Sequence, residues 1–428
     1  MTLTDESAPP VEGPQPEARV LRAARRVREA NVLLVTALAF VIGLAFGAVL
    51  IVVTTPNVLS SWSSFFGHPW ATISLTFNTV WGAYELLFCG AIVDPRSLAT
   101  AFTHSNKANW TTALTPISST LTYATPLILA GLGLAVTFRT KLFNIGGQGQ
   151  LIGGALGATL VGFSVHAPGI ILIPLEILGG IAGGMLIASI AGLLKAYTGA
   201  HEVITTMMLN YIMLNVLVYL LLIAPYQLPG ESQGESKFVL PAGQLPLLLG
   251  WLSNTLQVNL GIVIALVAVA VVSWFLNRST AGFEFQVVGE NPEAARTAGI
   301  NAKRVIVAAM CISGALVGLA GMVQVTGIDH SMTAGYGGTI GFDAITVALL
   351  GRSKPMGVLL AALLFGGLQA GGHHMQIYSP TNIDYSLALV IQAVIVFCVA
   401  TPALVIALFR LKVSGEAAES VTTGGWGS

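Results

Sequence analysis

Runs of about 20 residues with almost no charge recur along this chain, and they limit its possible folds more than any other feature. As a helix, each run is long enough to cross the roughly 30 Å of hydrocarbon in a bilayer. Of all residues, 54% are hydrophobic and 9% are charged, whereas a soluble domain carries about 25% charged residues. The sequence therefore predicts an all-α, polytopic membrane protein of about ten transmembrane or broken helices.

Composition divides the chain into three parts. An acidic, proline-rich start followed by five arginines between Arg19 and Arg28 predicts a disordered and basic amphipathic N-terminus over residues 1–31. A transmembrane domain follows over 32–412, and a flexible tail over 413–428. The expected segments of the transmembrane domain are 32–54, 119–138, 149–164, 170–193, 204–224, 258–276, 305–325, 341–351, 356–371 and 385–408.

The basic residues indicate which side of the membrane each connection faces. With a cytoplasmic N-terminus, all but three of the 19 lysines and arginines fall on the cytoplasmic side, as the positive-inside rule requires. Both termini are then predicted to be cytoplasmic. The same count favours an external, membrane-hugging segment over 62–118, because a crossing at 73–93 would invert everything after it. Whether 73–93 enters the bilayer stays open.

The polar connection "FRTKLFNIGGQGQLIGG" (138–154) runs into an unusually short, glycine-rich apolar stretch. Glycines within 146–149 weaken a helix and allow close packing, and irregular backbone survives at membrane depth only where it faces protein or a water-filled path. We therefore interpret the stretch as a broken helix that reaches the substrate pathway, with neutral hydrogen-bonding groups on Asn144, Gln148 and Gln150. The alternative is an ordinary turn whose small residues pack neighbouring helices.

Acidic residues near the spans are further pathway candidates, because charge is costly in hydrocarbon. Glu202 and Asp343 each begin the pattern acid, any residue, Ile-Thr, on segments expected to run in opposite directions. An inverted-topology repeat would give such a pair. Either acid could instead be a first-turn anion favoured by the helix dipole. Asn210, deeper in its span, is expected to line the pathway or to bond a neighbouring helix, and we find no carboxylate in the middle of a span.

Metal and enzyme chemistry are not expected. The three cysteines are scattered in apolar surroundings, and His373 and His374 fall just beyond an expected span, where a gate or docking surface is favoured over a metal site. The sequence contains no phosphate loop, so ATP is not expected to bind this chain in the usual backbone cradle. It also lacks a serine elbow, an HExxH motif and paired carboxylates.

The cytoplasmic connection 277–304 contains a short helix with its own start and stop signals. Asn291 is a good N-cap and Pro292 suits the first helical position. Glu293 lies at the positive end of the dipole, and Gly299 provides a left-handed stop. Such a short helix is marginal alone. It is predicted to be either a compact linker or a coupling helix that docks on a cytoplasmic partner.

Several motifs resemble one known family. "GENPEAARTAGIN" resembles the cytoplasmic coupling segment of ABC-importer permeases of the branched-chain amino acid, ribose and nucleoside type. "LFNIGGQGQLIGGALGA", "GAHEVITTMMLNYI" and "FDAITVALLGRSKPMGVLLAALLFGGL" are similar to signature stretches of its nucleoside-uptake branch, in the same order, between about residues 119 and 405. The resemblance implies that the residues coupled to the ATPase are Glu290, Asn291, Pro292, Glu293, Ala294, Ala295, Arg296 and Gly299.

The resemblance also implies an assembly in a bacterial inner membrane. Its other members would be a second related permease, a cytoplasmic subunit that binds ATP and Mg²⁺, and an external substrate-binding lipoprotein. This multi-pass chain would hold no cofactor, contact no nucleic acid, and form half of a pathway for nucleosides. One alternative is a permease for simple sugars such as ribose in the same family. The other is an ion-coupled secondary transporter, which normally places a carboxylate in mid-span.

Overall fold

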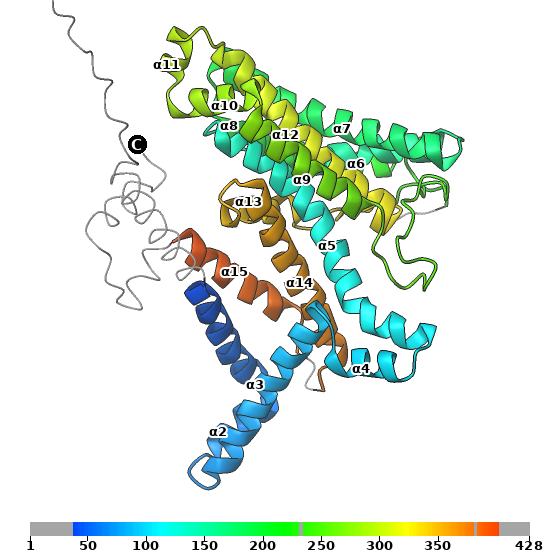
Figure 1. The fold of residues 1–428 in the computed structure, drawn as a ribbon, viewed down its shortest axis with the longest axis vertical. Coiled ribbons are helices and arrows are strands. Elements are labelled where there is room, and N and C mark those ends of the chain that lie inside the picture. The colour runs from blue at the N-terminus through cyan, green and yellow to red at the C-terminus, as the bar shows by residue number, and fades with distance from the viewer. Residues whose placement is uncertain (1–36, 231–233, 381–382, 402–428) are drawn as a thin grey trace, which may run out of the picture. The chain divides into compact units, whose positions relative to one another are not determined.

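The computed structural model describes residues 37–230, 234–380 and 383–401 (Figure 1). Within them the regular structure is helical, and β-structure is limited to isolated bridges. The predicted all-α class is thus confirmed. The predicted segments 1–31 and 413–428, and with them the predicted side of both termini, lie outside the described residues.

Seven helices of the described chain are long and apolar enough to cross a membrane. Together with α6 and the shorter α13 and α15, they overlap all ten expected segments. The seven are α1 (Ala37–Thr54), α5 (Lys107–Arg139), α7 with η1 (Gly169–Thr198), α8 (Glu202–Leu221), α9 (Gly261–Arg278), α12 with η2 (Ala302–Asp329) and α14 (Pro355–Tyr378). The others are α2 (Pro56–Ser63), α3 (Pro69–Ala91), α4 (Pro95–Thr103), α6 (Gly147–Ser164), α10 (Thr280–Glu290), α11 (Pro292–Thr297), α13 (Ile340–Leu350) and α15 (Ser386–Ala400).

The described residues divide into two compact units, one within 48–392 and the other of 37–47 with 393–401. In the second unit, Ala39 and Cys398 are buried together, and Leu38, Ile42 and Val394 pack against them. The first unit contains every predicted site residue and all of the described helices except parts of α1 and α15.

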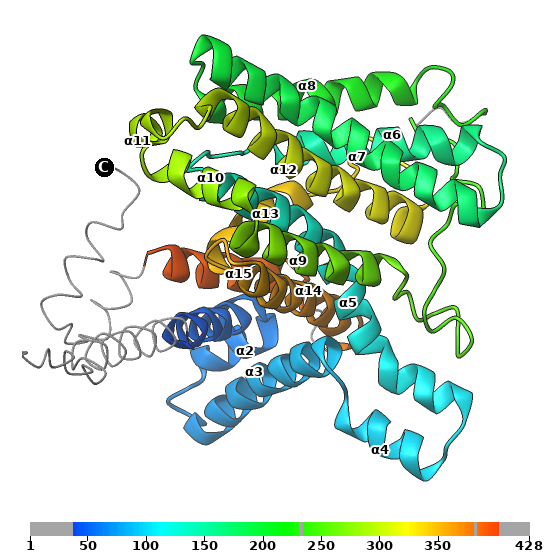
Figure 2. The same ribbon diagram turned by 45° about the horizontal axis from the view of Figure 1, so that its top comes forward.

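Helices α6, α7 and α12 form the most tightly packed group, and they lie side by side in Figures 1 and 2. Their contact faces are made of glycine. A Cβ atom on Gly154 would meet Gly318, one on Gly183 would meet Gly153, and one on Gly318 would meet backbone atoms of Gly180 and Gly184. Small residues let helix backbones approach closely where the surrounding lipid offers no hydrophobic driving force.

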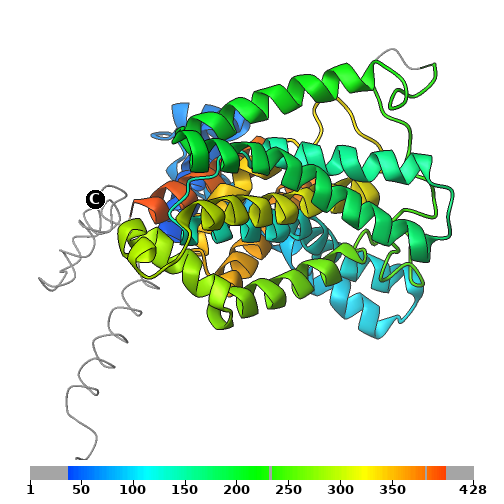
Figure 3. The same cartoon turned by 90° about the horizontal axis from the view of Figure 1, so that it is seen from above.

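The 33-residue helix α5 joins this group to the remaining helices. On one side Gly133 packs against the backbone of Ser313 in α12. On another side Gly131 packs between Val347 of α13 and Val358 of α14. Helix α8, in contrast, contacts α6 and α7 and exposes most of its length (Figure 3).

The ambiguous region around 73–93 is a helix that packs along α14 (Figure 2). In this helix, α3, the backbone of Leu87 lies against Gly371, and Gly90 lies against His374. Its outward side exposes large apolar residues, among them Trp70 and Phe77. Helix α3 is not one of the seven helices apolar enough to span, so its predicted external position remains a prediction.

Helices α6, α7 and α12 run between two ends of the unit. At one end lie residues 139–141, 195–202 and 289–304. Glu290 and Lys141 are 3.6 Å apart there, and the Lys303 Nζ lies 5.3 Å from the centroid of the Tyr197 ring. We call this the basic end, because these segments contain six of the lysines and arginines predicted to be cytoplasmic: Arg139, Lys141, Lys195, Arg296, Lys303 and Arg304.

At the opposite end, an irregular segment covers the turn between α6 and α7. The backbone N–H of Leu240 donates to Gly162 O at 3.1 Å, and that of Val239 donates to His330 O at 2.9 Å. The segment thus bridges the end of α6 and the end of α12. Lys237 approaches this end with its Nζ 5.4 Å from the Phe163 ring centroid.

Candidate functional site

The polar connection before α6 is held by side chains from other helices. Helix α6 begins at Gly147 without a side-chain cap of its own. The Oδ1 of Asn210 in α8 accepts from the Gly149 N–H at 2.8 Å, and its Nδ2 donates to Ile145 O at 2.9 Å. Thr206 Oγ1 accepts from the Ile145 N–H at 3.2 Å. The first N–H groups of a helix need external partners, and α8 supplies part of them.

Asn144 and Gln150 bond each other within the same connection. Asn144 Nδ2 donates to Gln150 Oε1 at 3.1 Å, and Gln150 Nε2 donates back to Asn144 Oδ1 at 3.0 Å. Asn144 Oδ1 also accepts from the Gly146 N–H at 2.9 Å, and Asn144 Nδ2 donates to Ser313 Oγ of α12 at 3.0 Å. The broken start of α6 is therefore anchored to α12 as well as to α8.

Gln148 connects this start to a second one. Its Oε1 accepts from the Gly341 N–H at 3.0 Å, and its Nε2 donates to Tyr336 O at 3.3 Å. A Cβ atom on Gly147 would lie 2.7 Å from Gly341 O, so only glycine permits this approach of the two backbones. The N-terminal ends of α6 and α13 consequently meet at Gln148. We call this meeting point the α6–α13 junction.

The junction brings together four of the six predicted pathway residues, namely Asn144, Gln148, Gln150 and Asn210. Each is at most 2% exposed, and each makes its hydrogen bonds to protein groups. Buried amides require such partners, so the geometry explains their burial. Their contact with substrate remains a prediction.

Glu202 and Asp343 lie apart from the amide groups. Glu202 Oε2 is 2.7 Å from Lys195 Nζ at the basic end, and Asp343 Oδ2 accepts from Thr339 Oγ1 at 2.9 Å. Both occupy the first turn of a helix. Helix α13 contacts α6, so the helix starts that the structure brings together are those of α6 and α13. The inverted repeat suggested by Glu202 and Asp343 remains a prediction.

The sequence predicted that the paired histidines lie just beyond a span. In the structure they lie within α14, which continues to Tyr378. The His373 ring stacks between Tyr123 and Tyr385, with centroid distances of 5.6 and 4.1 Å. His374 Nδ1 lies 3.2 Å from Leu86 O of α3. Within the described residues, no three His, Cys, Asp or Glu side chains gather as a metal site would require.

The predicted short helix at the basic end is present as α11. Asn291 Oδ1 accepts from the N–H groups of Glu293 and Ala294 at 3.0 and 3.1 Å, and Gly299 has φ of 79°. Ala295 is buried, whereas the side of α11 that carries Arg296 is exposed. The N-cap, Pro292 at N1 and the glycine stop are confirmed; docking on a partner remains a prediction.

A neighbouring helix was missed. Residues 280–290 form α10, which packs against α5, α9 and α12. A Cβ atom on Gly289 would meet the backbone of Arg139 and Thr140. The preceding Ser279 caps α10 by accepting from the Gly282 N–H at 2.9 Å. Helix α10 therefore connects α11 to the polar connection that leads into α6.

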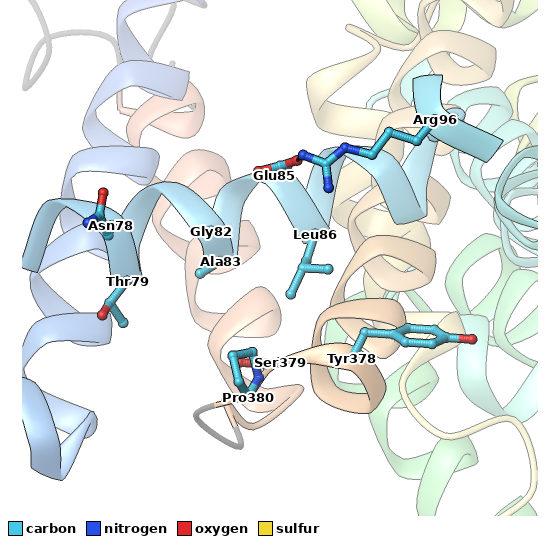
Figure 4. A pocket seen from close by; sticks show the side chains of 10 residues that line it. All are labelled: Asn78, Thr79, Gly82, Ala83, Glu85, Leu86, Arg96, Tyr378, Ser379 and Pro380. Carbon is cyan, nitrogen blue, oxygen red and sulfur yellow. Dashed lines mark hydrogen bonds and ion pairs between the residues drawn. The ribbon is translucent and has the colours of Figure 1, made fainter. Parts of the chain in front are cut away.

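The structure also has a surface hollow of about 380 Å³ between α3 and the end of α14 (Figure 4). Glu85 and Arg96 form an ion pair of 3.0 Å on its α3 side, and Tyr378 and Pro380 line the facing side. None of the predicted site residues lines this hollow.

Sequence reasoning missed one carboxylate inside an expected span, which lies near one end of the span rather than in its middle. Glu176 lies in α7, between Gly169 and Leu193, and its side chain is 0% exposed. Neither carboxylate oxygen has a hydrogen-bond partner within the described chain. The sequence signal was available, since Glu176 is the sole charged residue of that apolar stretch.

Comparisons with known proteins find a permease family and permease relatives. Residues 117–400 match a family described as branched-chain amino acid transport system / permease component. The chain is 34% identical to the guanosine ABC transporter permease protein NupP of Bacillus subtilis, over 91% of this chain and 99% of that one. It is 33% identical to the nucleoside ABC transporter permease protein NupB of Lactococcus lactis, over 77% and 85%.

A third relative has another named substrate. The glucose ABC transporter permease protein TsgB13 of Haloferax volcanii is 32% identical to the chain, over 67% of this chain and 76% of that one. No solved structure matches the chain.

Proposed function

The chain belongs to the branched-chain amino acid transport system permease family, and we propose that it forms half of the pathway of an ATP-driven nucleoside importer. It is a multi-pass, all-α membrane protein. The observation that supports the substrate class is the similarity to a guanosine permease, which extends over 91% of this chain. A bacterial inner membrane is the location we infer.

We infer the partners from the phosphate loop that this sequence lacks and from the surface that α11 exposes. Its sequence has no phosphate loop, so ATP and Mg²⁺ would be bound by a separate cytoplasmic subunit. The exposed side of α11 is the surface that we assign to that subunit. A second related permease would complete the pathway, and an external lipoprotein would deliver the substrate.

The mechanism that we propose is alternating access. Motion of the ATPase would push α11, and α10 would pass the displacement to residues 139–140 through the close contact of Gly289. From there the polar connection leads directly to the α6–α13 junction, where two helix starts meet at Gln148. A shift of this junction would change which side of the pathway is open.

If a shift of the junction releases its neutral amides from the protein groups that they bond here, these amides would suit an uncharged ligand rich in hydroxyl groups. Asn and Gln side chains both donate and accept hydrogen bonds, as recognition of a nucleoside sugar or base edge requires. Simple sugars share these groups, and the glucose permease relative supports the sugar alternative. A guanosine- or nucleoside-transporting assembly is favoured by the two relatives with higher identity.

Uptake of labelled guanosine by cells that express the complete assembly tests the proposal. ATP depletion should abolish uptake, while collapse of the proton and sodium gradients at constant ATP should leave it intact. The opposite pattern would identify an ion-coupled secondary transporter. Excess unlabelled nucleosides should compete with guanosine; competition by ribose or glucose alone would instead identify a sugar permease.

A further inference from the structure

Glu176 is enclosed by protein at the end of the unit opposite the basic end. A Cβ atom on Gly162 would lie 2.7 Å from Glu176 Oε1, and one on Gly243 would overlap the same oxygen. The carboxyl group therefore fits only because both facing residues are glycines. With 0% exposure and no partner for either oxygen within the described chain, an ionised carboxylate would be strongly disfavoured there.

Residues 239–245, which we call the cover segment, lie over Glu176. Gly243 lies directly over the carboxyl group, and Val239 lies against Gly162. The cover segment is held on one side by the Leu240 N–H, which donates to Gly162 O at 3.1 Å. On the other side the Leu245 N–H donates to Thr326 O at 2.9 Å. Lifting the cover segment would break these bonds and expose Glu176 to water.

The elements around Glu176 offer no charge that could pair with it in place. Helix α6 and the cover segment carry no acidic or basic residue, and α7 carries none between 169 and 193 other than Glu176 itself. On the adjoining connections, Lys237 lies beside the Phe163 ring and Asp329 accepts from Gln324 Nε2 at 3.0 Å. The remaining acidic residues and histidines that the structure describes on these connections are His166, His330 and Glu235, and Glu235 accepts from Ser331 Oγ. Glu231 lies outside the described residues.

We propose that Glu176 is a positioning residue that works as a protonated latch, seating the cover segment while its carboxyl group is neutral. When the segment lifts, the exposed O–H bond breaks, the proton passes to water and a hydrated carboxylate remains. Reseating the segment takes one proton up again. Because one proton is released, a rise in pH favours the lifted form by up to about tenfold per pH unit. The position of the cover segment outside the cell rests on the proposed function.

Thiol accessibility tests the latch without any transport measurement. In the complete assembly, with Cys89, Cys311 and Cys398 replaced by alanine, Val239→Cys places a thiol at a position that is 1% exposed. Ala242→Cys places a reference thiol at an exposed position of the same segment. Dividing the maleimide labelling rate at 239 by that at 242 removes the intrinsic pH dependence of thiol chemistry.

Between about pH 5 and pH 8 the ratio should rise by up to about tenfold per pH unit when Glu176 is present, because an exposed glutamate ionises near pH 4.3. In Glu176→Gln, which keeps the shape of the neutral acid, the ratio should be flat. His330→Asn should retain the rise, since Asn tolerates the left-handed backbone found at His330. A flat ratio in the protein with Glu176 overturns the latch, whether or not Glu176→Gln folds. An equal rise in Glu176→Gln also overturns it, and a rise lost in His330→Asn would assign the proton to His330.

Guanosine uptake separates the two proposals. If the accessibility ratio behaves as expected but guanosine is not transported, the latch stands and the nucleoside assignment fails. If guanosine uptake is driven by ATP but the accessibility ratio is flat, the nucleoside assignment stands and the latch fails.

Discussion

At the scale of single residues, Asn210 shows why a buried amide in a membrane helix need not touch a substrate. Its two bonds satisfy the Gly149 N–H and the Ile145 O, which the broken start of α6 leaves without helical partners. Sequence reasoning identified Asn210 as a candidate and left open whether it lined a pathway or bonded a neighbour. The structure provides the neighbour.

We expect Asn210→Ala to destabilise the protein by about 2 kcal/mol or more, because each buried group left without a partner costs roughly 1–3 kcal/mol. Thermal unfolding of the purified protein measures the loss. Asn215→Ala is the matched control, since Asn215 is exposed on the same helix and donates only to Tyr211 O. Equal unfolding midpoints for the two variants would contradict the bracing role of Asn210.

At the scale of helices, glycine positions decide how close α6, α7 and α12 can approach. Gly318→Ala should cost about 1–3 kcal/mol, the usual penalty for overpacking, because its Cβ would overlap the Gly180 and Gly184 backbone. Gly82→Ala in α3 is the control: nothing lies within 4 Å of its Cβ position, and alanine favours a helix by up to about 1 kcal/mol. Comparable losses in both variants, measured by thermal unfolding, would show that the glycine contacts are not limiting.

Helix α11 allows a functional test at the same scale. Arg296→Glu reverses a charge on its exposed side and should uncouple ATP hydrolysis from guanosine uptake, while the protein still inserts and unfolds normally. ATPase activity and uptake of the reconstituted assembly are measured together. Arg278→Glu makes the same change at the exposed end of α9, off α11, and should have little effect. Normal coupling in Arg296→Glu would remove α11 from the partner interface.

The sequence predicted helices well and their contacts poorly. Hydropathy located all ten expected segments, and capping rules located α11, because both signals depend on residues close together in the chain. Helix α10 was missed because its packing depends on Gly289 meeting residues 139 and 140, far away in sequence. The environment of Glu176 was hidden for the same reason, since Gly243 reaches it from a separate connection. A junction such as that of Gln148 with Gly341 is set by tertiary structure alone.

At the scale of the whole transmembrane unit, the distribution of charge and the arrangement of its connections agree. Segments around 139–141, 195–202 and 289–304 meet at the basic end, and the cover segment lies at the other end of the same helices. The positive-inside rule predicts that the basic end is cytoplasmic. The two ends should therefore face opposite sides of the membrane.

Cysteine labelling in intact cells tests this arrangement. In the background without Cys89, Cys311 and Cys398, Thr297→Cys marks α11 and Ala242→Cys marks the cover segment; both positions are exposed. An impermeant maleimide should label Ala242→Cys in intact cells, and Thr297→Cys only after the membrane is permeabilised. Labelling of both in intact cells would place the two ends on one side. Labelling of Thr297→Cys alone would invert the topology, and an ATPase in the cytoplasm could then not reach α11.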